Sequence, residues 1–550
     1  MFRRVRYFLL EPVASTISSA IFIRLMGVIY LMAMFPFIFQ YQGIMGKYGV
    51  QPATWLLEQA WSNEGWIALF HFPSLYWIWD SDEMLLALIL INCLAAVCLI
   101  INFRPFAAAS TAWISFLSFT TIGGDFTIII IDLFLAEVGF LTVLLTFAIN
   151  RFGYTPRIIH FLFLLLLFRM WFSMGMVKFY FPGESWKELT FFEYFFPYQP
   201  MPNPISWYVH KLPRWTYTIA IVLTFIIEIV FPFFIFLGKK WRMLAVSGFT
   251  VFSIMIWLTG NYGYFNPLTI IIGIFLFYDH DYPGKITDRF PPVAFINNST
   301  GNYGIYSISI TLVVMHIIYI GLLFSPRLHN PQNHLNYFCY FENTRNVNGW
   351  KQVFWAPFRL ISNLRLVNPY GVFKDISRFR VELRFEGSTD GITWQPYEFK
   401  YVPSGHTQIL KFFAPYYPRL DHLMFYESYG VGVYNDNPAN PRNSPQNPLN
   451  PYYTTSNPWI CKFLDALKNN NPHIVGLLSQ NPYEETSPEY IRVKAFLLNF
   501  TSKHEKKQSG RWWNEEYLFT PYDSSVETDK NCQPLYDLNE ILTVVQENYR

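Results

Sequence analysis

Charged residues are scarce in this sequence, and the common catalytic signatures are missing from it. Asp, Glu, Lys and Arg make up 14% of the 550 residues, against about a quarter in typical soluble domains, and the net charge is only +3. No polybasic run is present, which argues against a nucleic-acid partner. The sequence contains no GxSxG, HExxH or GxxxxGK[ST] pattern. These absences exclude the usual serine hydrolase, zinc protease and P-loop motifs.

Cysteine is also rare, with five residues in the whole chain. Cys93 and Cys98 lie inside an apolar run, where thiols pack as small apolar groups. Cys339, Cys461 and Cys532 are too far apart in sequence to form a CxxC pair, so neither a zinc site nor thiol catalysis is predicted. In an oxidising compartment these three would hold one disulfide and leave one thiol. No metal and no cofactor are expected.

Apolar residues are abundant, and long apolar runs are confined to the first 325 residues. Hydrophobic residues make up 52% of the chain and aromatic residues 20%. Runs such as Ala20–Gln40 and Phe126–Ile149 are long enough to cross a hydrocarbon core of about 30 Å. The pattern predicts eight or nine membrane spans, near residues 20–40, 84–102, 107–121, 126–149, 157–180, 216–237, 242–259, 266–278 and 304–325.

The chain therefore divides into a multi-span transmembrane domain, residues 1–325, and a soluble domain, residues 326–550. In the second domain FRVELRF, residues 379–385, alternates apolar and charged residues with the period of a half-buried strand. The Asp390-Gly391 pair is a hairpin signal. Two further strands are predicted at 394–402 and 409–414.

Residues 457–500 favour helix, because ICKFLDALKNN and EYIRVKAFLLNF place apolar residues at helical spacing. The predicted fold is thus a polytopic α-helical membrane domain followed by a mainly β, sandwich-like soluble domain with C-terminal helices.

Basic residues are distributed unequally between the predicted loops. With nine spans and a cytoplasmic N-terminus, eleven Lys and Arg residues fall on the cytoplasmic side and four on the opposite side. This follows the positive-inside bias and places the soluble domain in the lumen or periplasm. The loss of one short span would invert that placement. Asn298 and Asn499 begin glycosylation triplets, and only the second falls on the predicted non-cytoplasmic side.

Four segments carry a resemblance to a known family. Asn368–Lys400 contains NPYGVFKDISRFRVELRFEGSTDGITWQPYEFK, and Ala414–Tyr426 contains APYYPRLDHLMFY. In the membrane half, Leu189–Trp215 and Thr259–Ile270 are the corresponding segments. In their sequence and order these segments resemble the lipase maturation factor family, and the resemblance extends over almost the whole chain.

The resemblance implies an endoplasmic reticulum membrane protein in animals that secreted dimeric lipases require in order to fold and assemble. We therefore expect a membrane-anchored maturation factor whose partners are secreted client proteins, such as lipases, and the lipid bilayer. Its location would be the endoplasmic reticulum membrane in a eukaryote and the inner membrane in a bacterium. The sequence departs from the animal members at Tyr416, Tyr417 and His422, so their client surface is not carried over.

Charged groups inside the spans are candidates for function because an isolated charge in lipid is costly. Arg169 is expected to pair with Asp132 or Glu137 across neighbouring helices. Such a pair either fixes helix packing or lines a cavity that binds a substrate or moves protons. Lys178 either extends to the interface or acts as a base. The intramembrane candidates are Asp132, Glu137, His160, Arg169, Lys178 and Glu228.

The loop at 183–215 is rich in proline and aromatic residues, which suits either a structural plug on the helix ends or a contact for clients or lipid. In the soluble domain the candidates lie on the first strand, at its hairpin turn and in the PRLD segment, where Arg419 and Asp421 suggest a salt bridge. The candidates for client or interface contact are Trp186, Glu193, Tyr198, Trp207, His210, Arg380, Glu386, Asp390, Trp394, Arg419 and Asp421.

A second hypothesis is a membrane enzyme that modifies protein or lipid substrates. The family resemblance implies that the membrane half is similar to the helical scaffold of vitamin K-dependent gamma-carboxylases, and Lys178, His160 or His210 would then lie at a cavity. A maturation factor needs binding surfaces and no catalytic residues, so none is assigned. A transporter is disfavoured because no inverted repeat is evident.

Overall fold

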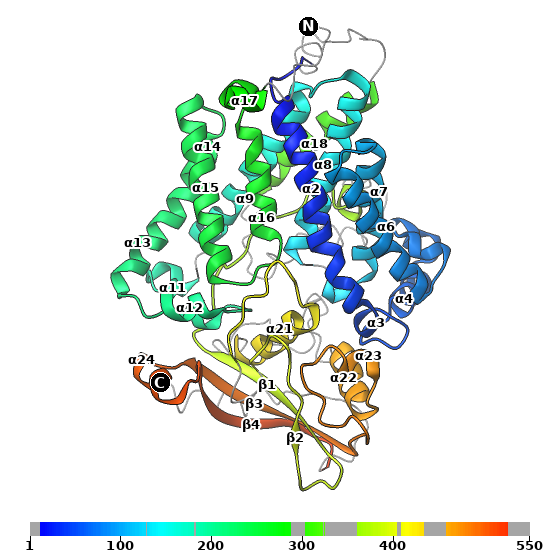
Figure 1. Cartoon of the computed structure of the whole chain (residues 1–550), viewed down its shortest axis with the longest axis vertical. Coiled ribbons are helices and arrows are strands. Elements are labelled where there is room, and N and C mark those ends of the chain that lie inside the picture. The colour runs from blue at the N-terminus through cyan, green and yellow to red at the C-terminus, as the bar shows by residue number, and fades with distance from the viewer. Residues whose placement is uncertain are drawn as a thin grey trace.

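The computed structural model describes residues 11–127, 129–180, 183–287, 303–322, 324, 360–403, 409–433 and 458–525. The described residues form a helical bundle with an antiparallel sheet at one of its ends (Figure 1). We call residues 11–324 the bundle and residues 360–525 the C-terminal part.

Seven helical stretches of the described chain are long and apolar enough to cross a membrane. They confirm that the chain is an integral membrane protein, since long apolar helices satisfy their own backbone hydrogen bonds in lipid. These stretches are α2 (Thr16–Met34) with η1 (Phe35–Phe39), α6 (Asp82–Ile100), α8 (Ile130–Phe152), α9 (Arg157–Tyr180), α13 (Arg214–Phe225) with η5 (Ile226–Val230) and α14 (Phe231–Phe234), α15 (Lys239–Thr259) and α18 (Tyr303–Leu322).

Two of the predicted spans are helices that are less apolar or shorter. Helix α7 (Pro105–Ile122) begins with a proline, which suits the first helical position, and is rich in Ala, Ser and Thr. It packs between α6 and α8, where the Asn92 amide donates to the Ala112 carbonyl at 2.7 Å. Helix α16 (Phe265–Ile272) continues as η6 (Gly273–Leu276).

Short helices connect the long ones at both ends of the bundle. Those between α2 and α6 are α3 (Tyr41–Ile44), α4 (Ala53–Glu64), η2 (Gly65–Ile67), α5 (Ala68–His71) and η3 (Leu75–Ile78). Helices α9 and α13 are joined by α10 (Glu184–Lys187), α11 (Phe191–Tyr198) and α12 (Pro204–Val209). The remaining ones are η4 (Gly124–Phe126), η7 (Asp279–Asp281) and α17 (Gly284–Thr287).

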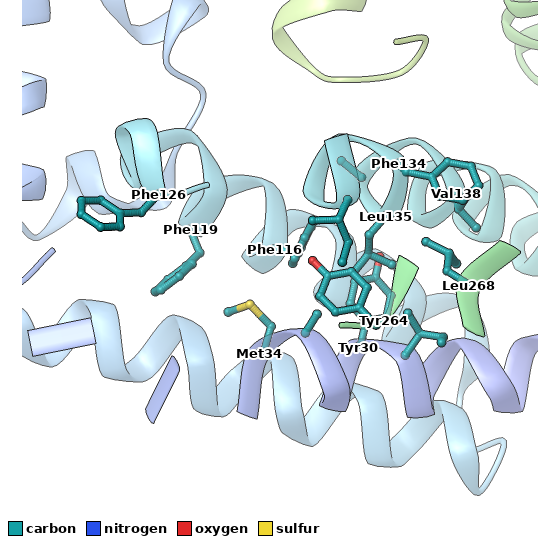
Figure 2. Close-up of a cluster of buried hydrophobic side chains, with 14 of the residues drawn as sticks. Tyr30, Met34, Phe116, Phe119, Phe126, Phe134, Leu135, Val138, Tyr264 and Leu268 are labelled. Carbon is teal, nitrogen blue, oxygen red and sulfur yellow. The ribbon is translucent and has the colours of Figure 1, made fainter. Parts of the chain in front are cut away.

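One portion of the largest core cluster lies where α2, α7, α8 and α16 meet. Figure 2 shows aromatic and aliphatic side chains from all four helices pointing toward one another. The Tyr30 and Phe116 rings are 5.8 Å apart and edge-on, which is a favourable geometry for aromatic pairs. The labelled members are Tyr30, Met34, Phe116, Phe119, Phe126, Phe134, Leu135, Val138, Tyr264 and Leu268.

The described residues of the C-terminal part contain a four-stranded antiparallel sheet in the order β2-β1-β3-β4. Its strands are β1 (Arg380–Ser388), β2 (Gln395–Pro396), β3 (Tyr490–Phe500) and β4 (Trp513–Asp523). Helix α21 (Arg419–Val433) packs on β1 and lies between the sheet and the bundle (Figure 1). The other helices are α22 (Pro458–Lys468), α23 (Pro472–Val475) and α24 (Lys503–Ser509).

Part of the predicted fold of this region was wrong. EYIRVKAFLLNF forms strand β3 rather than a helix, because alternate residues such as Ile491 and Val493 are buried while β3 pairs along its length with β1. The predicted helix at ICKFLDALK is confirmed as α22. The described residues form one sheet instead of a sandwich, and α21 and α22, rather than a second sheet, pack on its strands.

The first predicted strand is confirmed as β1, but it is fully buried rather than half-buried. Its charged side chains are accommodated by ion pairs: Arg380 with Glu382, Arg384 with Glu515 at 2.8 Å, and Glu386 with Arg492 at 2.6 Å. Burial of these charges is tolerable only because each has a partner of opposite sign.

The hairpin after β1 forms as predicted, although its second strand is short. Asp390 accepts hydrogen bonds from the backbone N–H groups of Ile392 and Thr393, and Gly391 has a positive φ of 72° that favours glycine. Of the predicted strand at 394–402 only Gln395–Pro396 is a strand, with an isolated bridge at Glu398. Residues 409–414 form no strand.

Candidate functional site

The first of two buried ionic centres joins α8, α9 and the start of the C-terminal part. Arg169 on α9 forms an ion pair with Glu137 on α8, and both side chains are fully buried. The structure thus selects Glu137, and not Asp132, as the partner of Arg169. Asn368 donates its backbone N–H to Glu137 Oε2 at 2.8 Å, and Tyr370 donates its hydroxyl to the same oxygen at 2.7 Å.

Arg169 is held on several sides. Its guanidinium also donates to the Asn368 carbonyl, and it lies 4.9 Å from the centre of the Tyr370 ring. Nε2 of His316, on α18, is 3.4 Å from Glu137 Oε1. This centre therefore connects α8, α9 and α18 to residues 368–370 of the C-terminal part. Each charged group in it has neighbours of complementary polarity.

The second centre joins Asp132 on α8 to Arg419, the first residue of α21. The guanidinium binds both carboxylate oxygens, at 2.5 and 2.8 Å, and Arg419 also donates to the Phe126 carbonyl at 3.0 Å. Tyr264 donates its hydroxyl to Asp132 Oδ1 at 2.5 Å. Such two-pronged contact is the strongest geometry available to an arginine and a carboxylate. The suggested salt bridge between Arg419 and Asp421 is not formed.

Neighbouring groups hold the Arg419 end of this contact in place. The Gln40 side chain accepts the Arg419 backbone N–H at 2.8 Å and donates to the Tyr417 carbonyl at 3.2 Å. The guanidinium lies 4.7 Å from the Phe37 ring centre and 4.8 Å from that of Tyr417. Burial alone would lower the pKa of Arg419, but the Asp132 carboxylate raises it above its ordinary value.

Asp421 has a different partner from the one its position in the PRLD segment suggested. Its Oδ1 accepts the backbone N–H groups of Tyr401 and Val402, at 2.8 and 3.2 Å. Burial raises the pKa of Asp421 to about 6, against an ordinary 3.8. The contact links α21 to the chain that follows β2.

Replacing Asp421 with asparagine is expected to flatten the pH dependence of stability. Because burial raises its pKa, the native state binds the extra proton between about pH 3.8 and 6, so the wild type loses stability as the pH rises through that window. The asparagine amide keeps the Oδ1 acceptor without titrating. We expect D421N to be more stable at pH 7 by on the order of 2 kcal/mol.

Thermal midpoints of the two proteins between pH 4 and 7 in mild detergent measure this difference. Glu382, whose pKa burial raises to about 7, leaves a residual slope in both proteins. Parallel curves for wild type and D421N would contradict the assignment to Asp421.

Lys178 and Glu228 form a further buried ion pair inside the bundle. The ammonium of Lys178 is 2.7 Å from each oxygen of Glu228, which lies in the π-helical turn η5. Lys178 therefore does not extend to the interface as an unpaired cation. A Cβ added at Gly175 would come within 2.9 Å of the Glu228 Cβ, so glycine permits this close approach of α9 and η5.

Two groups that the enzyme hypothesis would use, His160 and Lys178, are not brought together. His160 and Lys178 lie at opposite ends of α9, about 27 Å apart at 1.5 Å per residue. His160 lies beside the rings of Phe275 and Tyr278. His210 follows α12, beside Phe500, and burial lowers its pKa to about 4. Among the described residues, no group of three or more His, Cys, Asp or Glu is arranged to hold a metal ion.

The loop at 183–215 packs between the end of the bundle and the C-terminal part. Trp186 is buried and donates to the Phe373 carbonyl at 2.8 Å. Tyr198 donates to the Asn499 side chain at 2.7 Å, and Trp207 donates to the Thr501 hydroxyl at 3.3 Å. Glu193 forms an ion pair with Arg214 at 2.6 Å. The loop is thus a packed connector in this arrangement.

Helices α22 and α23 contact the same end of the bundle, on the side opposite the loop at 183–215 (Figure 1). The Trp459 ring lies 5.5 Å from the Phe126 ring, and the Asn471 amide donates to the Tyr48 carbonyl at 2.8 Å. A Cβ added at Gly43 would lie 2.4 Å from the His473 carbonyl oxygen, so the two parts touch backbone to backbone. The bundle and the C-terminal part therefore share an extended, closely packed interface.

Several interface residues were not predicted from the sequence. These are Asn368 and Tyr370 in the C-terminal part and Gln40 and Tyr264 in the bundle. Arg419 was a candidate, but its pairing with Asp132 was not predicted. One usable signal was present: two acids on α8 and only one arginine nearby imply that another cation must come from elsewhere. Of the remaining candidates, Trp394 is at the hairpin, where the Arg492 guanidinium carbon lies 4.0 Å from the centre of its ring.

Comparison with known proteins agrees with this architecture. The family model "Lipase maturation factor transmembrane domain" matches residues 17–283, and "Lipase maturation factor C-terminal domain" matches residues 366–438 and 448–521. Lipase maturation factor 1 of Bos taurus is 23% identical, over 90% of this chain and 87% of its own. Lipase maturation factor 2 of Xenopus tropicalis is 24% identical, over 89% and 80%. No solved structure matches the chain. Because the two models match in order and together cover most of its length, the chain belongs to the lipase maturation factor family.

Proposed function

We propose that this protein is a membrane-anchored maturation factor that assists the folding and assembly of secreted proteins, lipases among them. The observation that carries the proposal is the match to both family domains, whose relatives are named for lipase maturation. A maturation factor would shield apolar surface or unpaired strand edges on a folding client until native assembly covers them. Such work requires a presented surface, and no catalytic constellation.

The interface supports this role because it fixes the orientation of the C-terminal part. Two buried centres, Glu137 with Asn368 and Asp132 with Arg419, hold the sheet on one end of the bundle. The candidates that stay accessible to a client lie away from this interface, at the hairpin turn of Asp390. We propose the division between the domains at residues 325 and 326, just after α18.

Disruption of the gene in the source organism tests the proposal. We expect secreted lipases to lose specific activity, measured as activity per mass of secreted enzyme, while unrelated secreted enzymes keep theirs. Reintroducing the full chain should restore the activity. If every secreted lipase keeps its specific activity in the disrupted strain, lipase maturation is not the function.

We propose nine membrane crossings with the sheet on the non-cytoplasmic side, and the directions of the helices support this proposal. Asp279, after α16, accepts hydrogen bonds from the start of α2, at Thr16 and Ile17, whereas Tyr264, before α16, binds Asp132 at the sheet end. The segment from Tyr264 to Asp279, which contains α16 and η6, thus leads from the sheet end of the bundle to the opposite end. Cys461 is disulfide-bonded, which suits the endoplasmic reticulum lumen or the periplasm. Cys339, Cys532 and Asn298 lie outside the described residues.

Single cysteines at two exposed lysines are expected to report opposite sides of the membrane. Lys468 ends α22 beside the sheet, and Lys240 begins α15 at the other end of the bundle. An impermeant maleimide added to intact bacterial spheroplasts should label K468C and spare K240C. In sealed eukaryotic microsomes the pattern should reverse. Labelling of both sites, or of K240C alone in spheroplasts, would contradict the proposed topology.

A further inference from the structure

Two lysines from distant parts of the chain converge on one tryptophan. The ammonium groups of Lys211, between α12 and α13, and Lys506, on α24, each lie 5.4 Å from the centre of the Trp207 ring. Lys506 is also 3.0 Å from the centre of the Trp512 ring. Lys503 and Lys507 lie on the same short helix as Lys506. We call these four residues, Lys211, Lys503, Lys506 and Lys507, the lysine cluster.

The lysine cluster has an excess of positive charge. Within the described chain, none of its members lies within 4.0 Å of a carboxylate oxygen in an ion pair. Glu505 is the nearby acid, but its carboxylate accepts the Ser502 N–H at 2.6 Å and caps the start of α24. Partial burial lowers the pKa of Lys211 and of Lys506. Glu505 also interacts electrostatically with Lys211 and offsets part of the charge, so four lysines face one nearby acid. Such an excess of cations is stabilised when an anion binds between them.

The cluster lies at the level where a membrane helix begins. Helix α13 starts at Arg214, and its stretch is among the candidate spans. Just before and after that start, Tyr208, Leu212 and Trp215 are 59%, 48% and 64% exposed. Exposed aromatic and aliphatic side chains at the end of a spanning helix mark the boundary between headgroups and acyl chains. Figure 1 shows α24 at the rim of the sheet, below α12 and α13.

We propose that the lysine cluster binds the phosphate of an anionic phospholipid headgroup in the leaflet that α13 enters. Lysine ammonium groups bind phosphate as point charges, and basic side chains near a bilayer attract anionic lipid. Leu212 and Trp215, exposed beside the cations, supply the apolar contact that a free phosphate would not use. This reasoning rests on the bundle being membrane-embedded and is independent of the client.

One structural consequence follows from the position of α24. This helix connects β3 to β4, so a lipid bound to Lys506 holds the end of that hairpin against the bilayer. The headgroup would thus attach the C-terminal part to the lipid itself, in addition to the contacts that this part makes with the bundle.

Lipid titrations of the full chain in non-ionic detergent, followed by native mass spectrometry, test the proposal. The probes are dioleoyl phosphatidylglycerol and, as a neutral comparison, dioleoyl phosphatidylcholine. We expect the wild type to prefer the anionic lipid, and K211Q/K506Q to bind it about tenfold more weakly, with phosphatidylcholine binding unchanged. K503E/K507E alters only exposed side chains and should weaken binding similarly, which keeps the test valid if the first variant folds poorly.

K47Q/K468Q is the matched control, because it removes two exposed lysines near the same end of the bundle but outside the cluster. It should bind like the wild type. Equal affinity of the wild type and both cluster variants for phosphatidylglycerol would overturn the proposal. So would equal weakening in the control, or complete displacement of the lipid by inorganic phosphate at the same concentration. Capture of an acidic peptide in preference to the lipid would point to a protein ligand instead.

Discussion

Replacing Arg419 with glutamine is expected to lower the free energy of unfolding by about 3 to 5 kcal/mol, because it leaves Asp132 buried without its cation. Arg419→Lys should recover only part of this loss, since one ammonium cannot bind both carboxylate oxygens as the guanidinium does. Denaturant unfolding of the full chain in mild detergent measures the difference. Hydrogen exchange should show α21 opening first.

Arg378 provides the matched control for this substitution. It also forms ion pairs, with Glu184 and Glu188, but its side chain is 41% exposed and the Glu184 side chain 76%. Exposed pairs contribute little, so Arg378→Gln should cost less than about 1 kcal/mol. If both arginines gave the same small loss, the contact between Arg419 and Asp132 would not stabilise the interface.

Replacing Arg169 with glutamine is expected to be as damaging as the loss of Arg419, but the damage should be repaired by a second substitution. Arg169→Gln leaves the Glu137 carboxylate buried, at a cost of about 3 to 5 kcal/mol. In E137Q/R169Q both charges are removed, and the amide oxygen of the glutamine that replaces Glu137 still accepts from Asn368 or Tyr370. The double variant should therefore be more stable than either single variant.

A double-mutant cycle on unfolding in detergent gives the coupling energy of this pair. A coupling of several kcal/mol is expected. Additive losses would mean that the two residues act independently and that the ion pair is not the reason for their burial. Yield of folded protein in the membrane gives a second readout in the same strains.

The membrane half of the fold was predictable because lipid imposes a strong constraint on sequence. A spanning helix needs a long apolar run, so α2, α8 and α9 could be placed to within a few residues. The Ser and Thr residues of α7 weaken that signal, yet their hydroxyls donate to their own helix, as Thr120 does to the Phe116 carbonyl. A polar residue satisfied in this way remains compatible with a membrane helix.

The C-terminal part was less predictable because its strands are paired across long stretches of sequence. YIRVKAFLLNF can place apolar residues on one face of either a helix or a strand, and only pairing with β1, about 100 residues earlier, selects the strand. The prediction that β1 is only half-buried was wrong for a related reason. The arginines and glutamates of this strand are typical of an exposed face, but Arg380 and Glu382 neutralise each other, and Arg384 and Glu386 have partners on β4 and β3.

In the candidate site, too, some contacts could be predicted from the sequence and others could not. The pairing of Arg169 with Glu137 could be predicted, because both lie on neighbouring helices and a charge in lipid needs a partner. Asp132 could not be assigned to Arg419 from the sequence, since no local pattern connects an acid on α8 to an arginine in the C-terminal part. Lys178 and Glu228 were each singled out, but the π-helical turn that brings them together leaves no simple sequence pattern.

The distance along the chain between Asp132 and Arg419 also sets an order of events during biosynthesis. Arg419 lies 287 residues after Asp132, so at about 5 to 20 residues per second it leaves the ribosome about 15 to 60 s later. During that interval α8 is already in the membrane, and its acid has yet to meet its arginine. The ribosome therefore supplies α21 after the membrane helices, and the arrival of Arg419 completes the buried pair of Asp132 from outside the bilayer.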